Sequence, residues 1–368
     1  MPAGTYFIGL MSGTSLDGVD AALVDLSQAP KLLATSYLPF PEDLRSQILS
    51  LQAPGNSELE RAAQVSVRLA EIYAEAVEGV LGDSGYKPAS IAAIGCHGQT
   101  VRHRPDEGYT IQLNNPALLA ERTGISVIAD FRSRDIAAGG QGAPLVPAFH
   151  AACFTHPSID RIILNIGGIA NITYLPASSN VRDTVLGFDT GPGNLLLDFW
   201  IEKCTGSAFD AGGAFAASGT ANSQLLQEFL SDPYFSLPPP KSTGRDHFNA
   251  HWLSSFKLGT AAPENVQASL AELTARSIAD ATNRWCPAAA EFHVCGGGAH
   301  NGDLMGRLSS ALGNAPVGST EALGVHPDWV EAMAFAWLAQ RILTGTPGNL
   351  PAVTGAAGPR LLGAIYPA

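Results

Sequence analysis

Short apolar runs, typical of strands, alternate along the chain with longer stretches of helical periodicity, and this alternation is already visible in the first third. Two apolar runs, Tyr6 to Met11 and Val19 to Leu26, flank a turn of glycine, serine and aspartate, which predicts a β-hairpin. Apolar residues at helical spacing predict a helix over Glu58 to Leu81. The other strands predicted here are Lys31 to Phe40, Ile91 to Cys96 (followed by a polar loop, His97 to Thr100) and Ser126 to Ala129.

A similar order of elements recurs in the second half of the chain. The strand Arg161 to Gly167 and a return strand Ile169 to Leu175 predict a second hairpin. The matching order in the two halves indicates a duplicated α/β architecture of βββαβα type. The later elements are a third strand at Asp183 to Phe188, helices beginning with Asn194 to Lys203, a long helix at Ala268 to Trp285 and a buried strand at Glu291 to Cys295.

Two duplicated lobes predict a central cleft, because clefts at domain interfaces are common sites for small ligands. We assign residues 1–140 to the first lobe and residues 141–354 to the second, nucleotide-binding lobe. The glycine-rich segment from Phe131 to Pro147 is the predicted crossover between them. The tail at about 355–368 is expected to return to the first lobe as a strand or helix.

Charge and cysteine content narrow the class of protein. The chain has 21 lysines and arginines against 33 acidic residues, a net charge of −12, which argues against a nucleic-acid partner. The negative net charge is compatible with ATP binding, because backbone N–H groups and one metal ion can hold phosphates in an acidic protein. Five dispersed cysteines without a C-x-x-C pair favour a reducing cytosol. We expect no signal peptide and no membrane-spanning helix, and therefore a cytoplasmic location.

Glycine-rich turns are the candidate nucleotide-binding elements. The first hairpin turn can direct several backbone N–H groups at one anion, although an ordinary tight hairpin would have the same composition. No P-loop motif occurs in the chain. The candidate residues of this turn are Gly13, Thr14, Ser15, Leu16, Asp17, Gly18, Val19 and Asp20.

Two further turns stand at matching places in the second half. Gly167 and Gly168 form the turn of the second hairpin. In our interpretation this turn and the first turn bind the triphosphate of one nucleotide from two sides. A run of glycines after the strand Glu291 to Cys295 offers a flat backbone surface for a base or ribose. These glycines are Gly296, Gly297 and Gly298.

Asp189 is the candidate catalytic carboxylate. It stands between an apparent strand and a helix, where catalytic groups facing a cleft are often found. The alternative is a helix N-cap, although Thr190 or Asn194 would serve as well. Further along, residues Pro238 to Asp246, here called the strap, begin with three prolines and include two cations. The strap is either a surface linker or a segment near an anionic ligand.

Polar side chains of the first lobe suit a carbohydrate, because sugars are bound by planar amide, carboxylate and guanidinium groups. Each of them is also compatible with an ordinary loop residue. Cys96 continues an apolar strand and is expected in the core. The candidate sugar-binding residues are His97, Gln99, Asn114, Asp130, Arg132 and Asp135.

At the level of motifs, Gly9 to Asp20 resembles the opening of the anhydro-N-acetylmuramic acid kinases. The resemblance extends over nearly the full chain, and one departure is Asp246, where the family's strap is expected to carry glutamate. The other segments that resemble the family are Cys96 to Thr100, Asp135 to Leu145, Asn165 to Asn171, Gly187 to Asn194, the strap, Cys295 to Asn301 and Asp328 to Ala334.

The resemblance implies a two-lobed actin-like ATPase fold with duplicated ribonuclease H-like βββαβαβα lobes. It also implies a kinase that uses ATP and Mg²⁺. Such a kinase opens the anhydro bond of 1,6-anhydro-N-acetylmuramic acid with water and phosphorylates O6, yielding N-acetylmuramic acid 6-phosphate in cell-wall recycling. The family's catalytic aspartate matches Asp189, and its ATP motif matches Gly13 to Asp20.

Glu331 is a candidate for orienting the water shell of the metal, and a solvated helix position is the alternative. The expected partner is the sugar, with no nucleic acid and no membrane, and a homodimer is left open. Two other classes share some of these features. An actin-like or chaperone-like ATPase would have the lobes without a sugar site, and a hydrolase using Asp189 with a second carboxylate would need no ATP.

Overall fold

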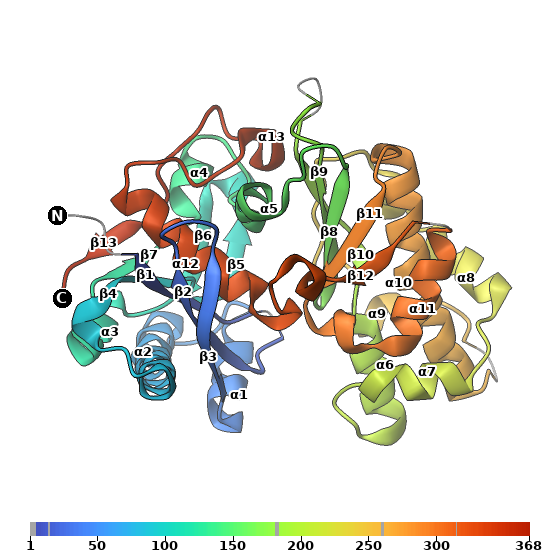
Figure 1. The fold of residues 1–368 in the computed structure, drawn as a ribbon. Helices are drawn as coiled ribbons and strands as arrows, with labels where there is room; N and C mark the ends of the chain where they lie inside the picture. The colour runs from blue at the N-terminus through green and yellow to red at the C-terminus, as the bar shows by residue number, and fades with distance from the viewer. Residues whose placement is uncertain (1–4, 14, 181–183, 259–260, 314) are drawn as a thin grey trace. The chain divides into compact units, whose positions relative to one another are not determined.

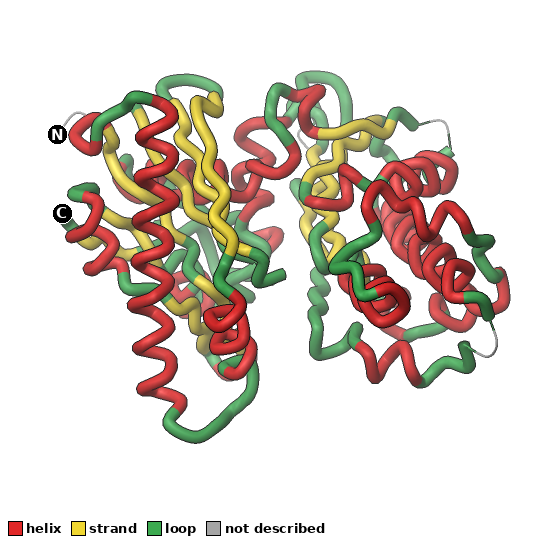
Figure 2. The backbone as a smooth tube through the Cα atoms, turned by 90° about the horizontal axis from the view of Figure 1, so that it is seen from below, coloured by secondary structure: helices red, strands yellow, loops and turns green. Residues whose placement is uncertain are grey.

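The computed structural model describes residues 5–13, 15–180, 184–258, 261–313 and 315–368, and the chain divides into two compact units (Figure 1). Unit 1 extends to Cys153 and resumes at Trp329, and unit 2 comprises Phe154–Asp328. Each unit contains one mixed sheet with helices beside it (Figure 2).

The sheet of unit 1 places its first strand near the centre. The first three strands are antiparallel to one another, and β4 and β7 continue the sheet in parallel on the other side of β1. A separate hairpin is formed by β5 (Gln99–Arg104) and β6 (Tyr109–Leu113). In sheet order, the strands are β13 (Ala364–Tyr366), β7 (Val127–Ala129), β4 (Ile91–Cys96), β1 (Tyr6–Met11), β2 (Gly18–Asp25) and β3 (Lys31–Pro39).

Helices cover both faces of this sheet, because successive side chains of a strand point to opposite sides. Ile8 and Leu10 of β1 belong to the core beneath α2 (Glu58–Ser84), whereas Gly9 faces α12 (Val330–Leu343). The other helices are α1 (Glu42–Ser50), α3 (Pro116–Thr123), α4 (Ser133–Ala137), α5 (Val146–Phe154), which ends at the unit boundary, α13 (Pro351–Thr354), and the 3₁₀ turns η1 (Pro88–Ser90) and η2 (Pro105–Glu107).

The contact of α12 with β1 and β4 requires glycine in both strands. A side chain at Gly9 would overlap the carbonyl oxygen of Ala332, and one at Gly95 would overlap that of Phe335. The helix backbone therefore lies directly on the sheet. Since α12 packs on β1 and β4, residues 329–354 belong to unit 1, whereas the sequence pattern assigned them to the second lobe.

Unit 2 repeats this plan. Its sheet has the same topology, with an antiparallel hairpin followed by a third antiparallel strand on one side and parallel strands on the other. In sheet order, the strands are β10 (Leu186–Pro192), β9 (Ile169–Leu175), β8 (Arg161–Ile166), β11 (Glu291–Cys295) and β12 (Val317–Ser319). The helices are α6 (Leu195–Thr205), α7 (Ala214–Ser218), α8 (Ser223–Leu230), α9 (Ala250–Ser254), α10 (Pro263–Trp285) and α11 (Gly302–Ala311), and the 3₁₀ turns are η3 (Ala211–Gly213), η4 (Pro233–Ser236), η5 (Gly297–His300), η6 (Thr320–Leu323) and η7 (Pro327–Trp329).

The predicted hairpins, the helix α2 and the duplicated order are confirmed, and three local predictions were wrong. Gln99 and Thr100 lie in β5 rather than in a loop, because they pair with β6. The strand predicted at Asp183 to Phe188 begins at Asp183, which lies outside the described residues, and it continues beyond Phe188, because β10 spans Leu186–Pro192. Asp189 therefore lies inside β10 and pairs with Asn171. The predicted crossover at Phe131 to Pro147 contains α4 and part of α5, and the units divide after Cys153.

The C-terminal tail returns to unit 1 as β13, antiparallel to β7. Within the described ranges, no helix combines the length and apolar character needed to cross a bilayer.

We predict that Gly95→Ala lowers the free energy of unfolding by about 3 kcal/mol, because the new methyl group overlaps the Phe335 carbonyl. Gly82→Ala is the matched control. Gly82 lies in α2 with open space around it, so alanine there should raise stability by about 0.5–1 kcal/mol. Urea denaturation of both variants measures the difference. A urea midpoint of Gly95→Ala equal to that of the wild type would show that the packing of α12 does not require glycine at position 95.

Candidate active site

Asp189 lies near the end of β10 and is bound by the strap and by Tyr234. Its backbone N–H donates to the carbonyl of Lys241 (3.1 Å), and its Oδ2 accepts from the backbone N–H of Thr243 (2.9 Å). The hydroxyl of Tyr234 donates to the Asp189 carbonyl (2.8 Å). The other carboxylate oxygen of Asp189, Oδ1, accepts no hydrogen bond from the described residues. The N-cap interpretation is wrong, because Asn194 occupies the N-cap of α6.

Burial raises the pKa of Asp189 to about 7, against the lowering effects of the Thr243 N–H and of the Lys241 cation. Lys241 is itself half-buried, and its ammonium donates to the Tyr234 carbonyl (3.1 Å) and lies 4.4 Å from the ring centroid of that residue. Burial, with Arg284 nearby, lowers the pKa of Lys241 to about 8. A carboxyl that titrates near neutral pH, with one oxygen held and the other available, is suited to general-base chemistry.

The turn between β8 and β9 is held by the start of α6. The backbone N–H groups of Gly193 and Leu195 donate to the carbonyl of Gly168 (2.9 and 3.1 Å), and that of Asn194 donates to Gly167 (2.8 Å). A Cβ at Gly167 or Gly168 would meet nothing closer than 3.8 Å. Since packing does not demand glycine at these two positions, they are compatible with close approach of a ligand.

The three glycines after β11 divide into two kinds. Gly296 has φ +78°, and a side chain there would overlap Asn165, while a side chain at Gly298 would overlap Ile166. These two glycines are therefore required by packing on β8. Gly297 is exposed, and a Cβ there would meet nothing closer than 3.7 Å. Of the three, Gly297 is the one left for contact with a ligand.

The turn between β1 and β2 likewise contains residues required by packing and residues whose backbone is open to a ligand. Thr14 lies outside the described residues. Leu16 (φ 61°) and Val19 are buried in the core, so only their backbone is available to a ligand. Asp17 has a structural role, because it accepts from the Ser15 hydroxyl (2.6 Å) and from the Gly18 N–H (3.1 Å). Gly18 packs against β3, and Asp20 pairs with Met11 in the sheet. A Cβ at Gly13 would meet nothing closer than 3.5 Å.

In unit 1, His97 follows β4 and is buried beside Phe335, with the ring centroids 4.7 Å apart. Two nitrogens of the Arg132 guanidinium lie 2.8 and 3.1 Å from its Nε2. Because a guanidinium only donates, Nε2 must accept, and the neutral ring carries its proton on Nδ1. Burial and the Arg132 charge hold the pKa of His97 well below its usual value.

Several buried polar atoms near His97 have no well-formed hydrogen bond to any of the described residues. His97 Nδ1 and Gln99 Oε1 are buried without a hydrogen bond of acceptable geometry from the described residues, although the Ser12 and Gly98 backbones lie close to His97. The side-chain oxygen and nitrogen of Asn114 are also buried, and among the described residues only the Cys96 thiol lies close enough to interact with this amide. Buried polar groups are normally satisfied, so these atoms indicate a place for a polar ligand. The thiol of Cys96 itself is buried with a pKa raised to about 12, as expected for a core residue.

Asp135 is fully buried, and its carboxylate accepts hydrogen bonds from three protein donors. Oδ1 accepts from Asn349 (2.7 Å) and Thr354 (2.8 Å), and Oδ2 accepts from the Gly142 N–H (2.8 Å). This arrangement supports a structural role that ties the segment after α4 to the C-terminal region. Asp130 is exposed with φ 61° and accepts from Ser133 (2.5 Å).

Glu331 occupies the first turn of α12, where its negative charge favours the charged form of Arg132. Burial outweighs this effect and lowers the pKa of Arg132 to about 10. Among the described residues, no group of three or more histidine, cysteine, aspartate or glutamate side chains is arranged to hold a metal ion.

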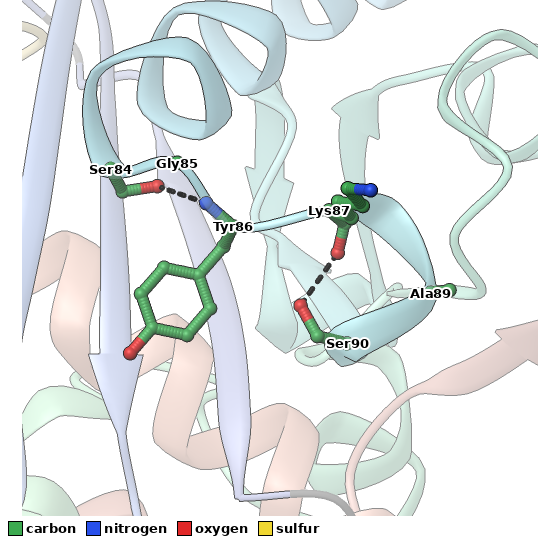
Figure 3. A pocket seen from close by; sticks show the side chains of 6 residues that line it. All are labelled: Ser84, Gly85, Tyr86, Lys87, Ala89 and Ser90. Carbon is green, nitrogen blue, oxygen red and sulfur yellow. Dashed lines mark hydrogen bonds between the residues drawn. The ribbon is translucent and has the colours of Figure 1, made fainter.

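A surface pocket of about 570 Å³ lies elsewhere in unit 1 (Figure 3). Its lining residues connect the end of α2 to the start of β4, whereas His97 follows the opposite end of that strand. We therefore do not assign it to the candidate site. The lining residues are Ser84, Gly85, Tyr86, Lys87, Ala89 and Ser90.

The sequence analysis did not identify Tyr234, and it left the strap as either a surface linker or a segment near an anionic ligand. The contact between Thr243 and Asp189 joins residues 54 positions apart, and no local spacing predicts it. The Lys-Ser-Thr-Gly-Arg segment after the prolines was the available signal, because small polar residues with free backbone N–H groups often surround anions.

Two units with the same strand order, each with a glycine turn in its first hairpin, place the chain in the class of actin-like ATPases with duplicated ribonuclease H-like units. A family model described as anhydro-N-acetylmuramic acid kinase matches residues 5–368. The chain belongs to this family.

Relatives bearing the name anhydro-N-acetylmuramic acid kinase cover the whole chain. The proteins of Nitrosospira multiformis and Nitrosomonas europaea are each 55% identical over 366 residues, covering 99% of this chain and 99% and 100% of their own lengths. That of Pseudomonas syringae pv. syringae is 53% identical over 365 residues, with 99% of both chains covered.

We predict that Asp189→Asn stabilises the fold at neutral and alkaline pH. The Asp189 pKa is raised from 3.8 to about 7, so the stability that its protonated form provides is present below pH 4 and lost as the pH rises to 7. Asparagine does not ionise, so the variant should gain up to about 4 kcal/mol over the wild type above pH 7. Urea denaturation at several pH values, with the exposed Asp280→Asn as control, measures the gain. A pH-independent difference would contradict the burial argument.

Proposed function

We propose that the chain phosphorylates 1,6-anhydro-N-acetylmuramic acid at O6 while water opens its anhydro ring, with N-acetylmuramic acid 6-phosphate and ADP as products. Family membership supports the substrate class. The observation that carries the mechanism is the buried Asp189 carboxyl, whose pKa is about 7 and whose Oδ1 is available.

Asp189 is the general base in this reaction. It takes a proton from a water molecule whose oxygen attacks the anomeric carbon C1, and the bond between C1 and O6 breaks. The γ-phosphoryl group of ATP is transferred to the released O6, so the leaving oxygen needs no separate acid, and ADP departs. Because Asp189 must be deprotonated, kcat/KM should decrease as the pH falls through about 7.

The open glycines support nucleotide binding. At Gly13, Gly167, Gly168 and Gly297 a Cβ would meet nothing closer than 3.5 Å, so the backbone is accessible to a ligand there. We assign phosphate contacts to the first and second turns and a base or ribose contact to Gly297. Phosphates approach such backbone surfaces without cationic side chains.

Mg²⁺ fits this site as a partner of the nucleotide. It usually keeps several waters and is held through one or two carboxylates together with substrate phosphates, so a preformed cluster of protein ligands is not required. When bound, it neutralises charge on the phosphates. We assign Glu331 to orienting its water shell, at the start of α12.

We assign sugar recognition to His97, Gln99, Asn114 and Arg132. The unpaired atoms of the first three offer both donors and acceptors, as hydroxyl and amide groups require. These atoms favour a sugar kinase over an ATPase without a second substrate. We assign Asp130 a contact at the exposed edge and Asp135 a supporting role through its hydrogen bonds. From this chemistry we infer that the enzyme acts in peptidoglycan recycling in the cytoplasm.

We predict that ¹⁸O from labelled water enters at C1 of the product when the protein is incubated with the anhydro sugar and Mg-ATP. Water is the nucleophile toward carbon in this mechanism, and O6 stays with the sugar. Mass spectrometry of the product locates the label. Label found only in inorganic phosphate would indicate simple ATP hydrolysis, and turnover without nucleotide would indicate a hydrolase.

We predict that Asp189→Asn lowers kcat on the order of 10⁴-fold, because asparagine keeps the shape but not the basic oxygen. ATP affinity measured by calorimetry should stay within a few-fold of the wild type, since the glycine turns are unchanged. Asp280→Asn again serves as control. Turnover close to wild type would exclude Asp189 as the base, and parallel loss of ATP binding would assign it a structural role.

A further inference from the structure

The strap is built around Asp189 by hydrogen bonds at two of its residues. Lys241 accepts from the Asp189 backbone (3.1 Å), and the backbone N–H of Thr243 donates to Oδ2 of its carboxylate (2.9 Å). Ser242, which lies between them, is exposed. The strap therefore fixes one carboxylate oxygen and brings the side chain of Thr243 next to the base.

Unit 2 itself holds the strap in this position. The ammonium of Lys241 donates to the carbonyl of Tyr234 (3.1 Å), while the hydroxyl of Tyr234 donates to the carbonyl of Asp189 (2.8 Å). Tyr234 packs edge-on against Phe248, with the ring centroids 5.6 Å apart. Thr243 is thus placed by hydrogen bonds and aromatic packing rather than by a free loop.

The side-chain hydroxyl of Thr243 is the unexplained group in this arrangement. Its Oγ1 is buried and has no hydrogen-bond partner among the described residues. A buried hydroxyl left unpaired costs about 1–3 kcal/mol, so it calls for a partner that the protein does not supply. Oδ1 of Asp189, on the carboxylate that the same residue binds, is likewise without a donor from the described residues.

We propose that Thr243 positions the water molecule that Asp189 deprotonates. The inference rests on the proposed function, in which Asp189 is the base. The water donates one O–H to Oδ1 of Asp189 and the other to Oγ1 of Thr243, which leaves an oxygen lone pair for C1. The first proton passes to Asp189 as the bond from oxygen to C1 forms. The second stays on the new anomeric hydroxyl, still bonded to Thr243.

A water held at two points has less rotational freedom to lose in the transition state than a water held at one. Removing the hydroxyl should therefore lower kcat and leave substrate binding unchanged. A direct contact between Thr243 and a sugar hydroxyl would have a different signature, because its loss would raise KM for the sugar.

The test compares three variants under saturating Mg-ATP. Thr243→Val keeps the shape and the backbone N–H but removes the hydroxyl, Thr243→Ser restores it, and Ser242→Ala removes an exposed hydroxyl from the same strap. We expect kcat to fall about 10- to 100-fold in Thr243→Val, with KM for the sugar within two-fold of the wild type. We expect Thr243→Ser to recover to within a few-fold of the wild type and Ser242→Ala to match it.

The pH profile separates positioning of water from a structural effect. Because the backbone N–H to Oδ2 survives in Thr243→Val, the acid limb of kcat/KM should keep the wild-type midpoint. A wild-type kcat, a raised KM for the sugar at constant kcat, or a displaced acid limb would each overturn the proposal. Absence of sugar turnover in the wild type, or full activity of Asp189→Asn, would instead overturn the proposed function.

Discussion

The close approach of α12 to the central strands of unit 1 is the constraint on which the candidate sugar site depends. Glycine at positions 9 and 95 lets the helix backbone lie on β1 and β4. The helix then carries Glu331 toward the Arg132 charge at its first turn and Phe335 against the ring of His97 one turn later. Any side chain at either glycine would move both contacts together. Packing of backbone on backbone thus sets the electrostatics of this site.

In unit 2 the candidate site depends on the burial of the Asp189 carboxyl, which costs free energy because the charged form loses its hydration. Desolvation of Asp189 is only partly offset by one backbone N–H and by a lysine that is itself half-buried. A carboxylate with more donors would keep an ordinary low pKa and would be a weak base at neutral pH. Asp135 in unit 1 differs from Asp189 in its number of donors, because its two oxygens are bound by three donors. In our proposal Asp189, whose side chain accepts one backbone N–H, is the base, and Asp135 has a structural role.

The glycine-rich motifs contain residues selected for two different physical reasons. Gly296 and Gly298 are required because β8 lies against them, whereas Gly297 between them is exposed and open. The same division occurs between Gly18, which packs on β3, and Gly13, which does not. Only the open positions support an argument for ligand contact, and the motif alone does not distinguish the two.

The sequence by itself determined the elements whose signals are local, and it identified the family through motifs that span the chain. Apolar periodicity and turn residues predicted both hairpins, α2 and the duplicated order, because each depends on neighbours within a few residues. Only the tertiary structure decided that α12 belongs to unit 1, that Asp189 lies inside a strand, and that Thr243 binds its carboxylate. These outcomes depend on burial and on hydrogen bonds between segments far apart in the chain, which local patterns do not encode.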